Sequence, residues 1–233
     1  MSEQSLFKLT AEDRRAAIDK LVAGAAPGSE FYLLLILSTV IVTLGVLLDS
    51  AAVVIGGMLV APIIAPILSL SMSIVMADIK LLIQSGKVLI ISMSLVLIIA
   101  LIISLAFVQL EANAEILSRV QSSVAYLIVA IAAGVAAAFA FARPKLSEAI
   151  PGIAVTVALL PPLVVSAIGI PLGDFSITVR SLGLFGLNFI GIVFAAMIIF
   201  SFMGFYGQRE QAVKKLEKEL ENQAEEKARN NQD

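Results

Sequence analysis

The sequence predicts an all-α polytopic membrane protein with six transmembrane helices, arranged as two inverted three-helix repeats. Three observations predict this fold class. Hydrophobic residues make up 59% of the 233-residue chain and charged residues only 15%, an unusual balance for a soluble domain. Two long apolar segments carry prolines near their centres. Lysine and arginine concentrate in alternate polar segments.

A spanning helix needs about 20 largely apolar residues. Six stretches meet this requirement, and short polar segments separate them: residues 31–48, 52–77, 87–109, 123–142, 149–171 and 182–206. We therefore expect a membrane domain over residues 29–207. Its two repeats are expected over residues 31–110 and 123–206.

The two ends of the chain are charged and are expected to be helical. In residues 1–28, a capping-box pattern from Thr10 to Asp13 precedes an apolar stripe, which predicts a cytoplasmic amphipathic helix. Residues 208–233 are rich in lysine and glutamate and predict a charged cytoplasmic helix. This second helix is either a solvated surface helix or a coil that clasps another subunit.

The distribution of basic residues predicts the topology. Fourteen of the sixteen lysines and arginines lie in the tails and in the loops that six crossings place on the N-terminal side. The other two, Arg119 and Arg180, lie in the opposite loops. By the positive-inside rule, both termini of this multi-pass protein are expected in the cytoplasm, with the spans in the plasma membrane.

Prolines interrupt the second and fifth predicted spans, which we therefore expect to be broken helices. The second span contains Pro62 and Pro66, and the fifth contains Pro161 and Pro162. Each proline removes a backbone donor, and in lipid the freed carbonyl needs another partner. We expect Thr156 to relieve the carbonyls freed in the fifth span. Paired breaks in two halves of a membrane protein indicate a binding or permeation site.

A shift of 96 residues aligns rare residue types of the two halves. It places Gly56 on Gly152, Pro66 on Pro162, Asp78 on Asp174 and Ser85 on Ser181. Because each half contains three spans, the second half starts on the opposite side of the membrane. Homologous halves would therefore form an inverted repeat.

Few polar side chains lie deep in the predicted spans. Asn188 is the only deep amide, and it is either structural glue between helices or a ligand in a pathway. Asp49, Asp78 and Asp174 lie at span ends, where they either cap helices or form charged vestibules that concentrate cations. The predicted solute or ion pathway comprises Pro62, Pro66, Pro161, Pro162, Gly56, Gly57, Gly152, Ser69, Thr156 and Asn188.

Composition argues against several classes of function. The chain contains no cysteine and no histidine, so thiol chemistry, a cysteine-based metal site and a histidine base are excluded. No hydrolase, metalloprotease or nucleotide-binding motif is present, and we expect no catalytic residue, metal or cofactor. The formal net charge of −2 gives no reason to expect a nucleic-acid partner.

Two stretches carry a family resemblance. Residues 29–78, with the run GGMLVAPIIAPILSLSMSIVMAD, closely resemble the bacterial and archaeal membrane family called domain of unknown function 389. Residues 146–174, with PGIAVTVALLPPLVVSAIGIPLGD, are similar to its second signature. The resemblance covers residues 29–206. It implies a multi-span membrane domain with the two proline motifs at its functional centre, and no particular activity.

The leading hypothesis is a transporter or channel that moves a small solute or ion through the bilayer. The alternative is a non-transporting scaffold, sensor or assembly subunit that uses its charged C-terminal helix. An enzyme acting on lipid is disfavoured, because no nucleophile–base pair is visible. The small residues of the stretch 130–142 (AIAAGVAAAFAFA) allow close packing against another helix and predict a homo-oligomer.

Overall fold

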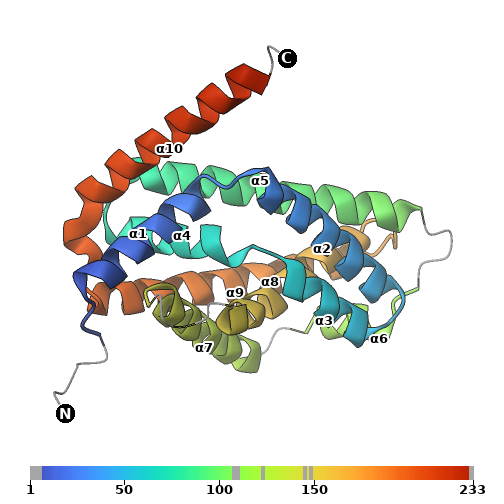
Figure 1. The fold of residues 1–233 in the computed structure, drawn as a ribbon. Helices are drawn as coiled ribbons and strands as arrows, with labels where there is room; N and C mark the ends of the chain where they lie inside the picture. The colour runs from blue at the N-terminus through green and yellow to red at the C-terminus, as the bar shows by residue number, and fades with distance from the viewer. Residues whose placement is uncertain (1–6, 107–110, 122–123, 144–145, 147–148, 231–233) are drawn as a thin grey trace.

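The computed structural model describes the chain apart from residues 1–6, 107–110, 122–123, 144–145, 147–148 and 231–233. The described residues form helices joined by turns, and most of the helices run along one bundle (Figure 1). In chain order they are α1 (Ala11–Ala25), α2 (Ser29–Leu47), α3 (Ala51–Val60), α4 (Ile64–Val75), α5 (Ile79–Leu105), α6 (Ala114–Ser118), α7 (Val124–Phe141), α8 (Ala149–Ile168), α9 (Phe175–Phe202), the 3-10 turn η1 (Phe205–Gln208) and α10 (Arg209–Asn230).

Several helices are long and apolar enough to cross a membrane. Helices α2, α5, α7 and α9 meet this criterion singly, and α3 with α4 forms a fifth candidate span with a bend of 57°. Helix α8 occupies the fifth predicted segment, but its described apolar part, Ala154–Ile168, is shorter than a full span. These apolar helices identify a membrane protein. Each of the six predicted segments is helical, and six crossings remain a prediction.

The proline breaks differ between the two halves. The second predicted span is broken as expected, between α3 and α4. The prediction of a broken fifth span is wrong, because α8 runs as one helix from Ala149 to Ile168 with Pro161 and Pro162 inside it. Adjacent prolines remove two neighbouring donors within one turn, and proline's fixed φ is compatible with a helix. The remaining helical hydrogen bonds and tertiary packing carry α8 past this point.

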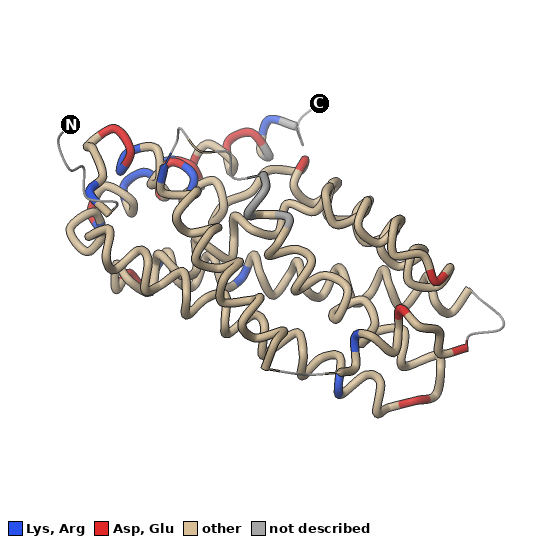
Figure 2. The backbone as a smooth tube through the Cα atoms, turned by 90° about the horizontal axis from the view of Figure 1, so that it is seen from below, with Lys and Arg blue, Asp and Glu red and all other residues tan. Residues whose placement is uncertain are grey.

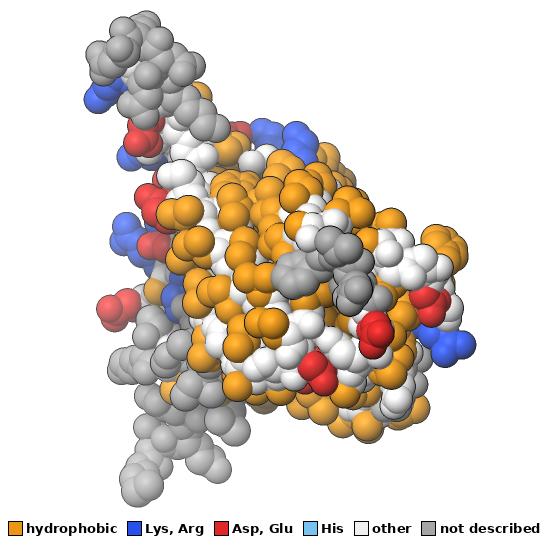
Figure 3. Space-filling model, turned by 90° about the vertical axis from the view of Figure 1, so that its right-hand side faces the viewer, with side chains coloured by type: hydrophobic (Ala, Val, Ile, Leu, Met, Phe, Trp, Pro, Cys, Tyr) orange, Lys and Arg blue, Asp and Glu red, His pale blue; other side chains and the backbone are white. Residues whose placement is uncertain are grey.

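Helix α8 is the buried centre of the bundle. Every residue from Leu159 to Gly169 is buried. The helix packs against α2, α3, α5, α7 and α9. A helix that is apolar on all sides suits such an enclosed position. The outer helices instead expose large apolar side chains such as Ile190 and Phe194, and Figure 3 shows hydrophobic groups over much of one end-on view.

The two ends of the bundle are charged. Figure 2 shows most lysine, arginine, aspartate and glutamate residues toward the ends of the molecule. Helix α1 and the start of α10 lie at one end, and α6 lies at the other (Figure 1). The structure therefore agrees with a topology that keeps both tails on one side, and the assignment of that side to the cytoplasm stays a prediction.

The small-residue stretch of α7 packs inside the chain. A Cβ atom added to Gly134 would lie 2.7 Å from the backbone oxygen of Ile192 in α9, and Ala133, Ala137 and Ala138 are buried. Such contacts require small residues at the crossing. One face of the stretch thus packs on α9 within the chain, whereas Ala132 and Ala136 are exposed, and the homo-oligomer stays a prediction.

The turn at Ala77 recurs 96 residues later at Gly173, and the same backbone turn also ends α2 at Asp49, where φ is 52° and the Ser50 N–H donates to the Gly45 carbonyl at 2.9 Å. Ala77 and Gly173 both have a left-handed backbone, with φ of 51° and 69°. The backbone N–H of the next residue, Asp78 or Asp174, donates to a carbonyl five residues earlier at 3.1 and 3.2 Å. Each of these aspartates then caps the following helix. The turns at Ala77 and Gly173 lie at opposite ends of the bundle (Figure 1).

We expect Ala77→Gly to stabilise the protein and Gly173→Ala to destabilise it, each by about 1 kcal/mol, because only glycine adopts positive φ without steric cost. A Cβ at position 173 meets no atom within 4 Å, so the effect would be purely conformational. Thermal unfolding in lipid nanodiscs measures both changes. The control is Gly183→Ala, an open helical position where alanine should not destabilise. Equal losses at positions 173 and 183 would contradict the explanation.

Both terminal helices pack on the bundle. Helix α1 buries Ile18 and Leu21 against its neighbours, chiefly α4. Helix α10 buries Ala212 and Leu216 and packs on α1. Four side-chain contacts attach α10: Arg209 Nε to Asp78 Oδ2 at 2.8 Å, Lys80 Nζ to Glu217 Oε1 at 2.6 Å, Lys215 Nζ to Asp19 Oδ1, and Gln223 Nε2 to the Ala26 carbonyl at 2.9 Å. The apolar stripe of α10 is thus used within its own chain.

The Asp78–Arg209 pair predicts a pH-dependent attachment of α10. Burial alone would raise the pKa of Asp78, but hydrogen bonds from the Leu81 N–H and from Arg209 outweigh it and hold the pKa below its ordinary value of 3.8. A lowered folded-state pKa stabilises the contact above about pH 3.8, and this contribution is lost as the pH falls through the folded-state pKa. We expect faster hydrogen exchange at the start of α10 below that pH, and already at pH 7 in Asp78→Asn.

The control for this experiment is Glu217→Gln, which removes the exposed Lys80–Glu217 pair. Exposed ion pairs contribute little to stability, so this variant should leave exchange at the start of α10 near the wild-type rate. If Asp78→Asn exchanges no faster than Glu217→Gln at pH 7, the buried carboxylate does not anchor α10.

Candidate functional site: a helix break and a proline pair

The break between α3 and α4 is a closed hydrogen-bonding arrangement. Ala61, the residue before Pro62, is extended with φ of −70° and ψ of 121°, as a following proline favours. The Ala61 N–H donates to the Met58 carbonyl at 3.3 Å. In a regular helix this carbonyl would accept from residue 62, but proline has no N–H. Ser38 Oγ of α2 donates to the carbonyl of Gly57 at 2.8 Å. Pro66 lies in the first turn of α4, where no helical donor is required.

In α8, one freed carbonyl is served by a neighbouring helix. Pro162 cannot donate to the carbonyl of Ala158, four residues earlier. The Nδ2 group of Asn188 in α9 donates to this oxygen at 2.8 Å, and Asn188 is 2% exposed. This contact confirms the interpretation of Asn188 as glue between helices. Thr156, expected to relieve the freed carbonyls, instead donates to Gly152 at 2.9 Å.

The second polar atom of Asn188 has no partner. Its Oδ1 is buried and accepts no hydrogen bond from the described residues. The Oγ atoms of Ser85 and Ser92 in α5 are also buried without a partner. Ser92 lies 96 residues before Asn188, so the repeat predicts that the two residues occupy equivalent positions. Sequence reasoning missed Ser92 because a serine within an apolar helix normally bonds to its own backbone.

The other predicted pathway residues lie in different surroundings. Ser69 Oγ donates to the Leu21 carbonyl of α1 at 2.9 Å and so joins α4 to α1. Gly57 packs closely on Val42 of α2, whereas Gly56 is exposed and meets nothing within 4 Å. A Cβ at Gly152 would lie 3.3 Å from the side chain of Ile64, at the start of α4. Of the predicted glycines, Gly152 therefore brings the N-terminal part of α8 close to the α3–α4 break.

The three aspartates have structural contacts. Asp78 Oδ1 accepts the Leu81 N–H at 2.9 Å, and Asp174 Oδ1 accepts the Ser176 N–H at 2.9 Å. The capping interpretation of these two residues is confirmed. Asp49 Oδ1 accepts the Glu115 N–H at 2.8 Å and thereby connects the α2–α3 turn to α6. A further role of the three carboxylates as vestibules stays a prediction.

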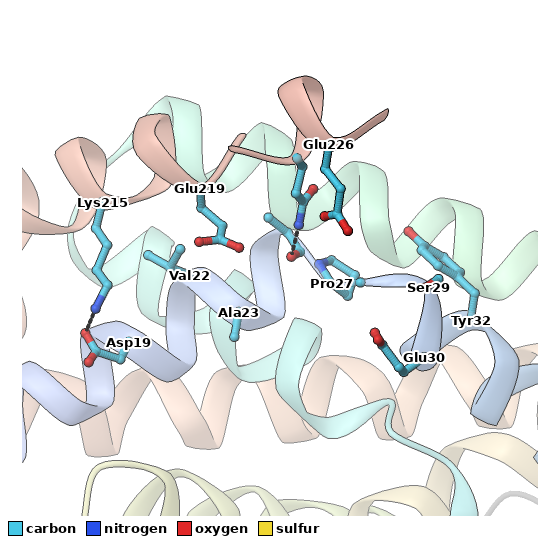
Figure 4. A pocket seen from close by; sticks show the side chains of 13 residues that line it. Asp19, Val22, Ala23, Pro27, Ser29, Glu30, Tyr32, Lys215, Glu219 and Glu226 are labelled. Atoms are coloured by element: carbon cyan, nitrogen blue, oxygen red, sulfur yellow. Dashed lines mark hydrogen bonds and ion pairs between the residues drawn. The ribbon is translucent and has the colours of Figure 1, made fainter. Parts of the chain in front are cut away.

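Surface cavities lie away from the proline regions. One of about 740 Å³ opens between α10 and the α1–α2 junction, and Figure 4 shows Glu30, Glu219 and Glu226 around it. A second, of about 620 Å³, lies between α5 and α10, beside Asp78. A third, of about 230 Å³, is apolar and lies between α5, α8 and α9. The first two form only when α10 folds back along the bundle, which the sequence did not reveal.

The apolar bundle contains one span that bends at a proline, α3–α4, and one buried helix with an internal proline pair, α8. These features define the class of polytopic α-helical membrane proteins. The model of the family described as domain of unknown function DUF389 matches residues 58–194, which include both proline regions and Asn188. The chain belongs to this family. The resemblance inferred from the two motifs is thereby confirmed.

A curated relative matches three quarters of the chain. An uncharacterized protein of Methanocaldococcus jannaschii is 34% identical over 175 residues, which cover 75% of this chain and 54% of the relative. The chain thus spans about half the length of the curated relative that it matches. No solved structure matches the chain significantly.

We expect Asn188→Leu to lower the free energy of unfolding by about 1–3 kcal/mol, because the buried Ala158 carbonyl loses its donor. Pro162→Ala should rescue much of this loss in the double variant, since an alanine N–H can reach the same carbonyl. Thermal unfolding of the four members of this double-mutant cycle measures the coupling. Additive effects of the two substitutions would show that Asn188 does not serve the proline-freed carbonyl.

Proposed function

We propose that this protein moves a small solute or ion across the membrane along a path between the α3–α4 break and the proline pair of α8. The observation that carries the proposal is the buried polar contact between α8 and α9, placed where a proline frees a carbonyl. Transporters use broken helices, such as α3–α4 here, to present backbone oxygens or helix ends to a ligand within the bilayer. No charged side chain is needed for this kind of recognition.

The inverted repeat predicted from the sequence is a second argument for the proposal. The turns at Ala77 and Gly173 share backbone geometry at an offset of 96 residues and lie at opposite ends of the bundle. Helix α4 packs against α9, and α5 packs against α8, as exchange of the two halves by a pseudo-twofold axis requires. In repeats of this kind, the ligand site lies near the interface of the halves. Gly152 and Ile64 meet at that interface.

The second candidate is a non-transporting scaffold or sensor. The cavity between α10 and the α1–α2 junction favours it, because an acidic surface at the end of the bundle offers a place for a basic partner. Residues 208–233 would then recruit that partner. Affinity capture from membranes with and without these residues tests the idea, and a stable partner lost on truncation, with no flux of any solute, would support the scaffold.

The transport proposal predicts that Pro66→Ala and Pro162→Ala each reduce flux in proteoliposomes, screened with a panel of monovalent ions and small organic solutes. A change of about 1.4 kcal/mol in a transport barrier alters the rate about tenfold, and an effect of this order is expected when an alanine N–H changes the hydrogen bonding along the proposed path. The matched control is Pro171→Ala, in the turn after α8, which should leave flux near wild type. Unchanged flux in both test variants would exclude the proline regions as the path.

A further inference from the structure

Buried hydroxyls in the spans mostly donate to a carbonyl about one turn earlier in their own helix. The hydroxyls that do so are those of Thr39, Thr43, Ser71, Ser73, Ser104, Thr156 and Ser166. This local bond satisfies the group without a ligand. Buried polar atoms that lack such a bond are therefore informative, and Asn188 Oδ1 is one of them.

Asn188 Oδ1 differs from the other unpartnered atoms. Among the buried side-chain atoms without a partner in the described residues, it alone is an acceptor that carries no hydrogen. Its orientation is fixed, because the Ala158 oxygen accepts hydrogen bonds and therefore has to face the Nδ2 group. A rotation of the amide would bring two acceptors together. The Oδ1 atom thus points to something that is positive or that donates.

A second backbone oxygen lies next along the chain. Pro161 cannot donate to the carbonyl of Val157, which directly precedes Ala158. The amide of Asn188 contacts α8 at Ala158, so its oxygen and the neighbouring Val157 carbonyl would together offer hard oxygen ligands without net charge. The described residues contain no cluster of acidic residues that could hold a divalent metal ion. Such a ligand set suits a monovalent cation.

We propose that Asn188 Oδ1 and the Val157 carbonyl bind a dehydrated monovalent cation between α8 and α9. This inference rests on the proposed function and names the transported or coupling ion as a cation of the sodium or potassium class. The equivalent position in the first half carries Ser92, whose Oγ is buried and unpartnered. An inverted repeat thus presents a polar oxygen without a protein partner at the matching place in each half.

The test is equilibrium binding of radioactive sodium and rubidium to purified protein in nanodiscs, with choline as the balancing cation. The variant Asn188→Leu with Pro162→Ala removes the Oδ1 atom and gives the Ala158 carbonyl a backbone donor, so the protein should remain folded. The control is Ser166→Ala, which removes a buried hydroxyl from the same helix that bonds only to the Leu163 carbonyl. The unfolding midpoint in each salt gives a second readout.

Wild type and Ser166→Ala should bind one cation saturably and unfold at a higher temperature in its presence. The double variant should bind at least about tenfold more weakly, a loss of about 1.4 kcal/mol. The absence of saturable binding in wild type, or equal binding in the double variant, overturns the site and leaves water as its occupant. Cation binding without flux of any solute would refute transport and support the cation site. Flux without cation binding would support transport and refute the cation site.

Discussion

Every backbone carbonyl inside a bilayer needs a partner, and the core of this protein is arranged around the carbonyls that its prolines leave without one. In water, a missing helical donor is replaced by solvent at little cost. In hydrocarbon, each unsatisfied group costs several kcal/mol, so another part of the protein has to supply the donor. Ser38 of α2 and Asn188 of α9 do this for α3 and α8, respectively. The Ser38 contact joins α3 to α2, and the Asn188 contact joins α8 to α9.

This requirement applies most strongly to α8, which carries the proline pair and lies at the centre of the bundle. Helix α8 combines two prolines with a buried stretch, and its freed Ala158 carbonyl lies against α9. Only a side chain from a packed neighbour can serve it there. An amide provides both a donor and an acceptor, and the structure uses only the donor. The remaining acceptor, Asn188 Oδ1, is the reason to propose a ligand at this contact in addition to its structural role.

Much of the fold follows from the sequence, because hydrophobicity and length decide which segments become apolar helices. The six segments, the N-terminal capping box at Thr10 and the caps at Asp78 and Asp174 follow from local chemistry. The role of Asn188 was only half predicted, since its partner lies 30 residues away. The continuity of α8, the internal packing of Gly134 and the attachment of α10 depend on tertiary contacts. No local pattern contains that information.

The different outcomes at the two proline sites follow from proline spacing. Pro62 and Pro66 lie four residues apart, so the second proline cannot serve the carbonyl of the first, and the helix is interrupted across a whole turn. Ala61 then turns extended and the chain bends by 57°. In α8 the prolines are adjacent, and their missing donors affect two consecutive carbonyls, one of which Asn188 serves. In the first half, the helix bends where the donors are missing. In the second half, the helix stays continuous and a side chain of α9 supplies one of the missing donors.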